Sequence, residues 1–111
     1  MNEAWTEICK LDDITPNSGR AALVNGKQIA IFRVRQADND AFYALDNHCP
    51  FAGANVLSRG IIGSLGQALV VASPIYKQHF CLETGQCLED GSAQLATWQV
   101  RLDGDSVQLA E

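Results

Sequence analysis

Residues 21–34, AALVNGKQIAIFRV, contain the clearest indication of the fold. Asn25-Gly26 separates two apolar runs, and this dipeptide is the strongest short-range signal for a two-residue β-hairpin turn. The second run is apolar at every position from Ile29 to Phe32, as in a strand that is covered on both faces. The sequence therefore predicts a hairpin whose second strand is buried on both sides.

Other short runs of β-forming residues lie on either side of this hairpin. We expect strands at residues 5–9, 42–45, 69–72, 79–82, 86–88, 97–102 and 106–109. Helical periodicity is not sustained anywhere, and only a turn at residues 11–14 and a brief piece within residues 54–58 are candidates. The glycine-rich residues 59–66 are predicted to form a loop. The pattern predicts an all-β fold of short antiparallel strands in packed sheets or a small barrel, with residues 1–111 as a single domain.

Composition excludes several classes of function. Eight Lys and Arg residues against thirteen Asp and Glu give a net charge of -5, which is unsuited to nucleic acid or to an anionic membrane surface. No apolar run is long enough to span a membrane, and no secretory signal is visible. We therefore expect a cytoplasmic protein without nucleic-acid or membrane partners, whose four cysteines are reduced.

Two segments, residues 46–53 and 72–85, concentrate the residues that carry chemistry. Each follows an expected strand, so we expect both to be loops at a sheet end. His79 and Cys81 would point to one face of a strand and could contribute to a metal site, with Cys87 nearby. A zinc site is disfavoured because no C-x-x-C-like pairs are present. A Cys–His nucleophile at Cys49 or Cys81 is disfavoured as well, because no third group is marked to orient the base.

The order of these motifs resembles that of a Rieske-type [2Fe–2S] domain. A strand leads into a first loop at residues 46–51, a connection includes residues 58–61, and a second loop at residues 73–76 precedes FCLETG at residues 80–85. The resemblance extends from about residue 20 to the end of the chain. It implies a Rieske-like fold.

The ligand residues of that family are largely replaced here. Mapped residue by residue, the four ligand positions hold Cys49, Phe51, Ser73 and Tyr76. A Rieske cluster is bound by two cysteines on one iron and two histidines on the other. Only the thiol among these four can ligate as the family does, and His48 and His79 each lie three residues from a histidine position. The resemblance therefore implies a Rieske-like scaffold without a cluster and without another metal.

One family combines this scaffold with lost ligands, the small subunit of bacterial assimilatory NAD(P)H-dependent nitrite reductase. The segment VASPIYKQHF, residues 71–80, is similar to the second loop of that family. Asn47, Pro50 and Phe51 resemble its first loop. The resemblance implies an accessory oxidoreductase subunit of nitrate and nitrite assimilation that docks to a catalytic large subunit. That large subunit would hold FAD, sirohaem and an iron–sulfur cluster and reduce nitrite to ammonium, and no catalytic residue is expected on this chain.

The two loops supply the candidates for the docking surface, because aromatic anchors with a nearby arginine are favoured at interface cores. The candidates are Phe51, Arg59, Tyr76, Lys77, Gln78, His79 and Phe80. For Phe51, Tyr76 and Phe80, ordinary core or loop packing is an equal alternative.

Two alternative functions stay open at this point. One is a Rieske-type electron-transfer ferredoxin, which the missing ligands disfavour. The other is a small thiol- or metal-binding protein that uses His79, Cys81 and Cys87. From the apolar residues around them we also expect Cys9 and Cys81 to be buried and Cys49, on a loop, to be the most exposed thiol.

Overall fold

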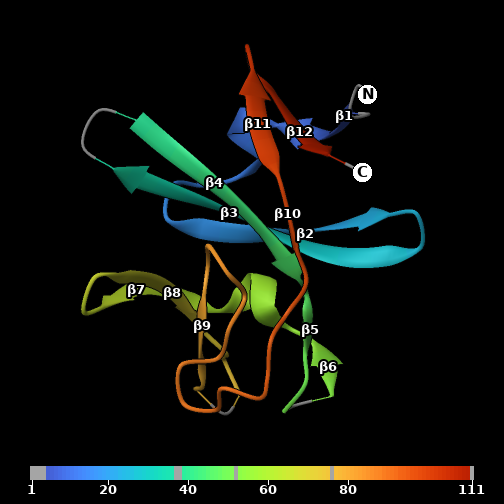
Figure 1. Ribbon diagram of the computed structural model, residues 1–111. Coiled ribbons are helices and arrows are strands. Elements are labelled where there is room, and N and C mark those ends of the chain that lie inside the picture. Colours follow the sequence, from blue (N-terminus) through green and yellow to red (C-terminus); the bar gives the residue numbers. More distant parts are fainter. Residues whose placement is uncertain (1–4, 37–38, 52, 76, 111) are drawn as a thin grey trace.

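The computed structural model describes residues 5–36, 39–51, 53–75 and 77–110, which form antiparallel sheets in three tiers (Figure 1). The terminal sheet has the order β1-β12-β11, with β1 at Trp5–Lys10, β12 at Ser106–Ala110 and β11 at Val100–Asp103. The central sheet has the order β10-β4-β3-β2, with β10 at Thr97–Trp98, β4 at Asn39–Asp46, β3 at Lys27–Gln36 and β2 at Ser18–Val24.

The third tier, which we call the tip, lies on the other side of the central sheet from the chain ends (Figure 1). It contains the β5-β6 pair, with β5 at His48–Cys49 and β6 at Ala54–Asn55, and the sheet β7-β8-β9, with β7 at Ile61–Leu65, β8 at Ala68–Ala72 and β9 at His79–Cys81. Two short 3₁₀ helices, η1 at Leu11–Asp13 and η2 at Leu57–Arg59, connect strands. Within the described residues, no helix has the length and apolar character needed to cross a membrane.

The predicted hairpin is confirmed. β2 pairs with β3 from Ser18↔Arg33 to Val24↔Lys27, and the two turn residues, Asn25 and Gly26, have φ values of 52° and 79°. Positive φ at both central residues defines the type I′ turn, whose twist matches that of the flanking strands.

Strand β3 is buried on both faces, as its apolar run predicts. Ala30, Phe32 and Val34 point into a core shared with the tip. Ile29 and Ile31 point the other way, into a core shared with the terminal sheet. Because side chains alternate along a strand, this one strand joins the two cores.

Residues 59–66 do not form the expected loop. After the last residue of η2, residues 61–65 form β7, which pairs with β8 from Ile61↔Ala72 to Leu65↔Ala68. Gly66, with φ 62°, begins the two-residue turn of this hairpin. The glycines suggested a loop, but the β-branched residues at 61 and 62 and the partner strand outweigh that local preference.

The single strand expected at residues 97–102 is divided at Gln99. β10 pairs with β4, whereas β11 pairs with β12, so the chain leaves one sheet and joins another. Residues 86–88 do not form a strand either, because their pairing is limited to the isolated bridges Phe80↔Cys87 and Gln86↔Gln94. Strict alternation in the sequence does not reveal which sheet a strand joins.

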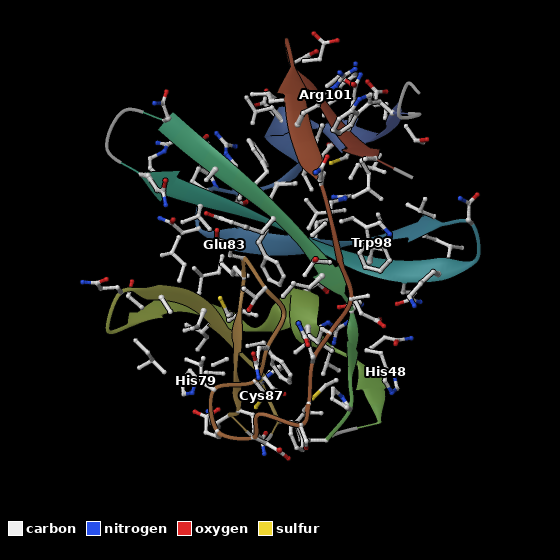
Figure 2. The ribbon with its side chains drawn as sticks, viewed as in Figure 1. His48, His79, Glu83, Cys87, Trp98 and Arg101 are labelled. Atoms are coloured by element: carbon white, nitrogen blue, oxygen red, sulfur yellow. The ribbon has the colours of Figure 1, made fainter. Side chains whose placement is uncertain are left out.

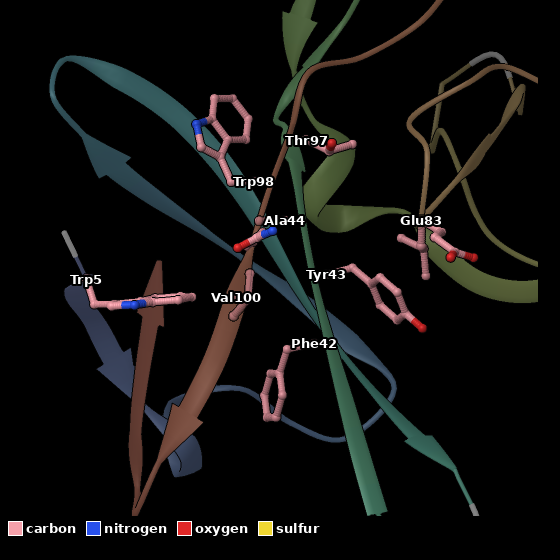
Figure 3. Close-up of a pocket in the computed structure, with 10 residues that line it drawn as sticks. Trp5, Phe42, Tyr43, Ala44, Glu83, Thr97, Trp98 and Val100 are labelled. Carbon is pink, nitrogen blue, oxygen red and sulfur yellow. The ribbon is translucent and has the colours of Figure 1, made fainter. Parts of the chain in front are cut away.

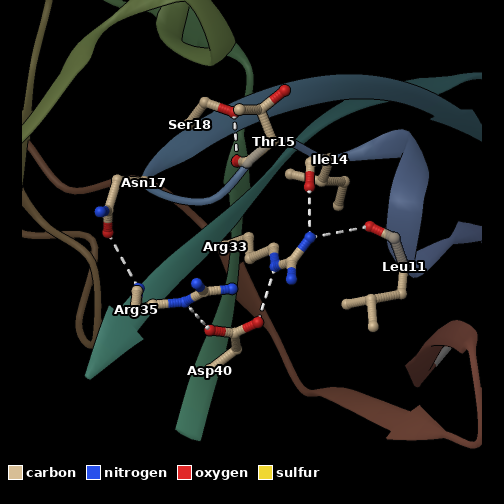
Figure 4. A network of polar contacts seen from close by, with 8 residues as sticks. All are labelled: Leu11, Ile14, Thr15, Asn17, Ser18, Arg33, Arg35 and Asp40. Carbon is tan, nitrogen blue, oxygen red and sulfur yellow. Dashed lines mark hydrogen bonds and ion pairs between the residues drawn. The ribbon is translucent and has the colours of Figure 1, made fainter. Parts of the chain in front are cut away.

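A buried arginine fixes the turn between β1 and β2 (Figure 4). Arg33 is only 8% exposed and donates hydrogen bonds to the backbone oxygens of Leu11 and Ile14, at 3.2 and 2.8 Å. Its Nε lies 2.7 Å from Asp40, which also accepts a bond from the exposed Arg35. Hydrogen bonds from Arg35 and then Arg33 lower the pKa of the Asp40 carboxyl.

Replacement of the buried arginine is expected to destabilise the fold. Arg33→Met should lower the free energy of unfolding by about 3 kcal/mol, since the buried Ile14 carbonyl and the part-buried Leu11 carbonyl lose their charged donor. Arg35→Met is the matched control and should have a small effect, because that side chain is exposed. Denaturant unfolding at pH 7 measures both, and equal effects of the two changes would contradict this role of Arg33.

The same network predicts a pH dependence. A carboxyl whose folded pKa is lowered adds stability above its ordinary pKa and loses it as the pH falls through the folded value. The stability difference between the natural chain and Arg33→Met should therefore shrink at acidic pH, as Asp40 becomes protonated. A difference that is constant from pH 7 to pH 2 would contradict the assignment.

Candidate functional site

Asn47 positions the first loop of the tip, which follows β4 and contains β5. Asn47 is 1% exposed, and its Oδ1 accepts a hydrogen bond from Ser58 N–H at 2.8 Å while its backbone oxygen accepts one from Leu57 N–H. Its Nδ2 donates to Gln28 Oε1 at 3.2 Å and to the backbone oxygen of Asn55 at 3.4 Å. One buried amide thus joins the loop to η2, β3 and β6. Because a buried amide must have its donors and acceptor paired, these bonds fix the position of the loop.

Backbone hydrogen bonds of Ser73 close the second loop of the tip, which connects β8 to β9. The Ser73 backbone N–H donates to Gln78 O at 2.9 Å, and its backbone oxygen accepts from Lys77 N–H at 3.0 Å. Lys77 has φ 66°, a left-handed conformation that costs a non-glycine residue about 1–2 kcal/mol. The loop therefore tolerates local strain at an exposed lysine.

The two loops converge at Cys49 and Ser73, which the resemblance to Rieske-type domains maps to the cysteine ligands. Cys49 Sγ lies 3.5 Å from Ser73 Oγ, although 24 residues separate them, and the two residues are 0% and 1% exposed. Two thiolates on one tetrahedral metal, each about 2.3 Å from it, are about 3.8 Å apart. The scaffold thus keeps the spacing of two ligands but presents one thiol and one hydroxyl.

An aromatic pair occupies the neighbouring space. The Phe51 and Phe80 rings have centroids 6.1 Å apart and planes inclined by 44°, a favourable tilted arrangement. Phe51 is partly buried, whereas Phe80 is 0% exposed and belongs to the core between the tip and the central sheet. For Phe80 the docking hypothesis is wrong and the packing alternative is correct. Tyr76 lies outside the described residues.

The residues at these positions do not fit a Rieske cluster. At the described positions the donor set is one buried thiol and one hydroxyl, and the phenylalanine where an imidazole would stand packs against Phe80. A hydroxyl is a poor replacement for a thiolate, and a phenyl ring has no donor atom. Among the described residues, no three His, Cys, Asp or Glu side chains are grouped so that they could hold a metal ion.

The two histidines lie on different parts of the tip (Figure 2). His79 Nδ1 is 2.7 Å from Glu89 Oε2, and His79 N–H donates to Glu89 Oε1 at 2.7 Å. Both hydrogen bonds lower the pKa of the Glu89 carboxyl, and the bond from the His79 backbone has the larger effect. His48 Nδ1 is instead 3.2 Å from Asn55 Oδ1. Each imidazole therefore has its own partner on the tip.

The proposed group of His79, Cys81 and Cys87 is not brought together. His79 and Cys81 lie on the same face of β9. Cys87 is paired with Phe80, the residue between them, and therefore lies on the opposite face. It is buried, with Sγ 3.8 Å from Glu89 Oε1. The geometry does not support the metal-binding alternative.

Three of the remaining docking candidates differ in exposure. Arg59 and Lys77 are exposed, and neither side chain forms an ion pair within the described part of the chain. Gln78 is partly buried, and its Oε1 accepts no hydrogen bond from the described residues. On this acidic protein, Arg59 and Lys77 are thus exposed cations with no ion-pair partner among the described residues.

An aromatic groove that the sequence did not reveal lies away from the tip loops. It has a volume of about 420 Å³ and is bounded by Trp5, Phe42 and Trp98 (Figure 3). Arg101 lies 4.3 Å from the Trp5 ring centroid and Lys27 lies 5.7 Å from that of Trp98, so both indoles form cation–π contacts. The groove forms where the chain passes from β10 to β11, a change of sheet that local sequence patterns do not encode.

Comparison with known proteins agrees with this geometry. Residues 4–110 match the family described as "Rieske-like [2Fe-2S] domain". The chain is 44% identical over 105 residues to the nitrite reductase (NADH) small subunit of Salmonella typhimurium, and the match covers 95% of both chains. This chain belongs to the nitrite reductase small-subunit family. The solution structure of the Escherichia coli protein NirD is 40% identical, covers 99% of this chain and 98% of its own, and superposes with a TM-score of 0.86.

A further relative has a different architecture. The nitrite reductase [NAD(P)H] large subunit of Klebsiella oxytoca is 40% identical over 103 residues, which cover 93% of this chain but 10% of that protein. In that protein, a segment that resembles nearly the whole small subunit is part of the large-subunit polypeptide.

The exposure of Cys9, Cys49 and Cys81 is the reverse of what the sequence predicted. Cys49 is fully buried, because the two loops close over it, and Cys9 and Cys81 are partly exposed. Burial and then the nearby Asp13 raise the pKa of the Cys9 thiol. Burial also raises the pKa of the Cys81 thiol, but hydrogen bonds from the Thr84 side chain and from the Thr84 and Glu83 backbone N–H groups outweigh it and leave that pKa below its usual value.

Thiol labelling of the native protein should follow this order. Cys81 should react first with iodoacetamide at pH 7.5, because it is accessible and has the lower pKa, and Cys9 should follow. Cys49 and Cys87 should react only on unfolding. Peptide mass spectrometry over time measures each rate, with the urea-unfolded chain as the control, and modification of Cys49 before Cys81 would contradict the described packing.

Proposed function

We propose that this chain is the accessory small subunit of a NAD(P)H-dependent nitrite reductase and acts by docking to the catalytic large subunit. In this proposal the large subunit holds FAD, sirohaem and an iron–sulfur cluster and performs the reduction of nitrite to ammonium. The small subunit carries no cofactor and no catalytic residue. The reaction belongs to nitrate and nitrite assimilation.

The main support for a large-subunit partner comes from the similarity to the Klebsiella oxytoca protein. A segment similar to 93% of this chain is covalently joined there to a nitrite reductase large subunit. A tether keeps two domains at high effective concentration, so a contact between them would be favoured even if each surface were modest. We infer that the separate small subunit makes the corresponding contact as a free chain.

The tip loops are the proposed docking surface. Arg59 and Lys77 are exposed cations on a protein with a net charge of -5, so they would match an acidic patch on the large subunit. Lys77 occupies a left-handed backbone conformation that glycine would adopt at lower cost. The presence of a lysine rather than a glycine at this strained position supports a role for its side chain. Phe51, partly buried beside the same loops, is the proposed apolar contact.

The electron-transfer alternative has weaker support. A ferredoxin needs a cluster near its surface, and the positions that would hold it carry a thiol, a hydroxyl and a packed phenyl ring. The cytoplasm remains the proposed location. The four cysteines are free thiols, which suits a reducing compartment.

Charge reversal at the tip should weaken the complex. Arg59→Glu combined with Lys77→Glu is expected to reduce the affinity for the purified large subunit by about 2 kcal/mol or more, since two favourable charges become repulsive. Isothermal titration calorimetry at low salt measures the dissociation constant. The thermal midpoint of each free variant shows whether it is folded.

Arg101→Glu is the control for each tip substitution made singly, because it makes the same charge change on the terminal sheet, and Arg59→Glu and Lys77→Glu are therefore also measured one at a time. Arg101→Glu should leave the affinity within about twofold of the natural chain. Equal losses from each single tip substitution and from Arg101→Glu would indicate a general charge effect. No binding by the natural chain would contradict the proposed function itself.

A further inference from the structure

Strand β7 is the outer strand of the sheet β7-β8-β9. Among the described residues, no strand pairs with its second edge. An edge strand presents backbone N–H and C=O groups that another chain can pair with. The position of β7 in the tip is visible in Figure 1, where its hairpin with β8 projects from the lower part of the molecule.

The register shows which backbone groups face outward. Leu82 N–H donates to Leu69 O and Ser73 N–H donates to Gln78 O, so the odd-numbered residues of β8 bond toward β9. The even-numbered residues of β8 therefore bond toward β7, where Leu65 stands opposite Ala68 next to the two-residue turn. It follows that Ile62 and Ser64 direct their N–H and C=O groups away from β8, toward the free edge.

The side chains of β7 do not protect this edge. Ile61 is 72% exposed and Leu65 is 43% exposed, and both lie on the same face of the strand. The sequence IIGSL contains no charged residue and no proline, the devices by which natural edge strands usually avoid pairing. An exposed, uncharged and apolar edge is a liability unless a partner covers it.

We propose that β7 accepts an extended segment of the large subunit, which adds to the sheet β7-β8-β9 as a further strand. This inference rests on the proposed function and specifies a second element of the contact. The bound segment would exchange backbone hydrogen bonds with Ile62 and Ser64. Its alternate side chains would be apolar and would cover Ile61 and Leu65, as in other cases of strand addition.

The large subunit fits this edge better than a second copy of the chain does. Five residues of strand bury far less than the roughly 800 Å² per partner that a stable interface needs, so pairing of two β7 strands alone would be weak. The large subunit also has the proposed contact with the tip, and Arg59 of that surface, the last residue of η2, lies two residues before Ile61, the first residue of β7. Two adjoining contacts with one partner reinforce each other.

Two substitutions test the edge by different routes. Ser64→Pro removes an outward N–H that β8 does not use, and Ile61→Lys places a charge where an apolar side chain of the partner would lie. Each should weaken binding to the purified large subunit at least tenfold. Leu23→Lys is the matched control, because Leu23 is also 72% exposed but lies on β2. It should change the affinity by less than threefold, and thermal midpoints report whether each variant is folded.

Amide hydrogen exchange supplies a test that needs no variant. It is measured by NMR on the isotope-labelled chain with its sequence unchanged. The amides of Ile61, Gly63 and Leu65 should already be protected in the free subunit, because they bond to β8. Those of Ile62 and Ser64 should become at least tenfold slower only when the large subunit is added. This two-residue periodicity is specific to strand addition.

The outcomes separate the two proposals. A complex that forms without added protection at Ile62 and Ser64, and with full affinity for Ile61→Lys and Ser64→Pro, would overturn the inference and leave the proposed function standing. If the same amides become protected in the isolated chain as its concentration is raised, a second copy of the chain is the occupant. That result would also overturn the inference. Absence of any complex would instead overturn the proposed function.

Discussion

The antiparallel ladder of β3 with β2 and β4 sets the position of everything else in the molecule, because both faces of β3 are covered. Phe32 and its even-numbered neighbours pack toward the tip, and Ile29 and Ile31 pack toward β12 of the terminal sheet. The tip loops are tied to the same strand by hydrogen bonds from Asn47 to the backbone and side chain of Gln28. The candidate docking surface is therefore supported by the most buried part of the fold.

The tip keeps the geometry of a ligand site without its chemistry. Cys49 and Ser73 still meet at a distance suited to two ligands of one metal, yet only one of them could act as a thiolate. The loops are held by their own hydrogen bonds, through Asn47 and Ser73, and by the packing of Phe51 on Phe80. The described surface of the tip is thus organised by these side-chain and backbone contacts, and it can serve as a rigid platform for another protein.

Local patterns in the sequence predicted the β2–β3 hairpin and the all-β class. They failed where the outcome depends on distant partners. The alternating run at residues 97–102 divides at Gln99 because its halves join different sheets, and the glycine-rich residues 59–66 include β7 because β8 lies beside them. Cys49 was expected to be exposed on a loop, but the second loop closes over it. Burial of a loop residue depends on the other loop, which is 24 residues away.

The central claim is that this Rieske-like scaffold acts without a cluster, and the most direct test is its iron and acid-labile sulfide content after anaerobic reconstitution with ferrous iron and sulfide. The account predicts a colourless protein with less than about a tenth of an iron atom per chain, because one competent ligand cannot hold a cluster that needs four. Two iron atoms and two sulfides per chain, with the visible absorption of a Rieske centre, would contradict it.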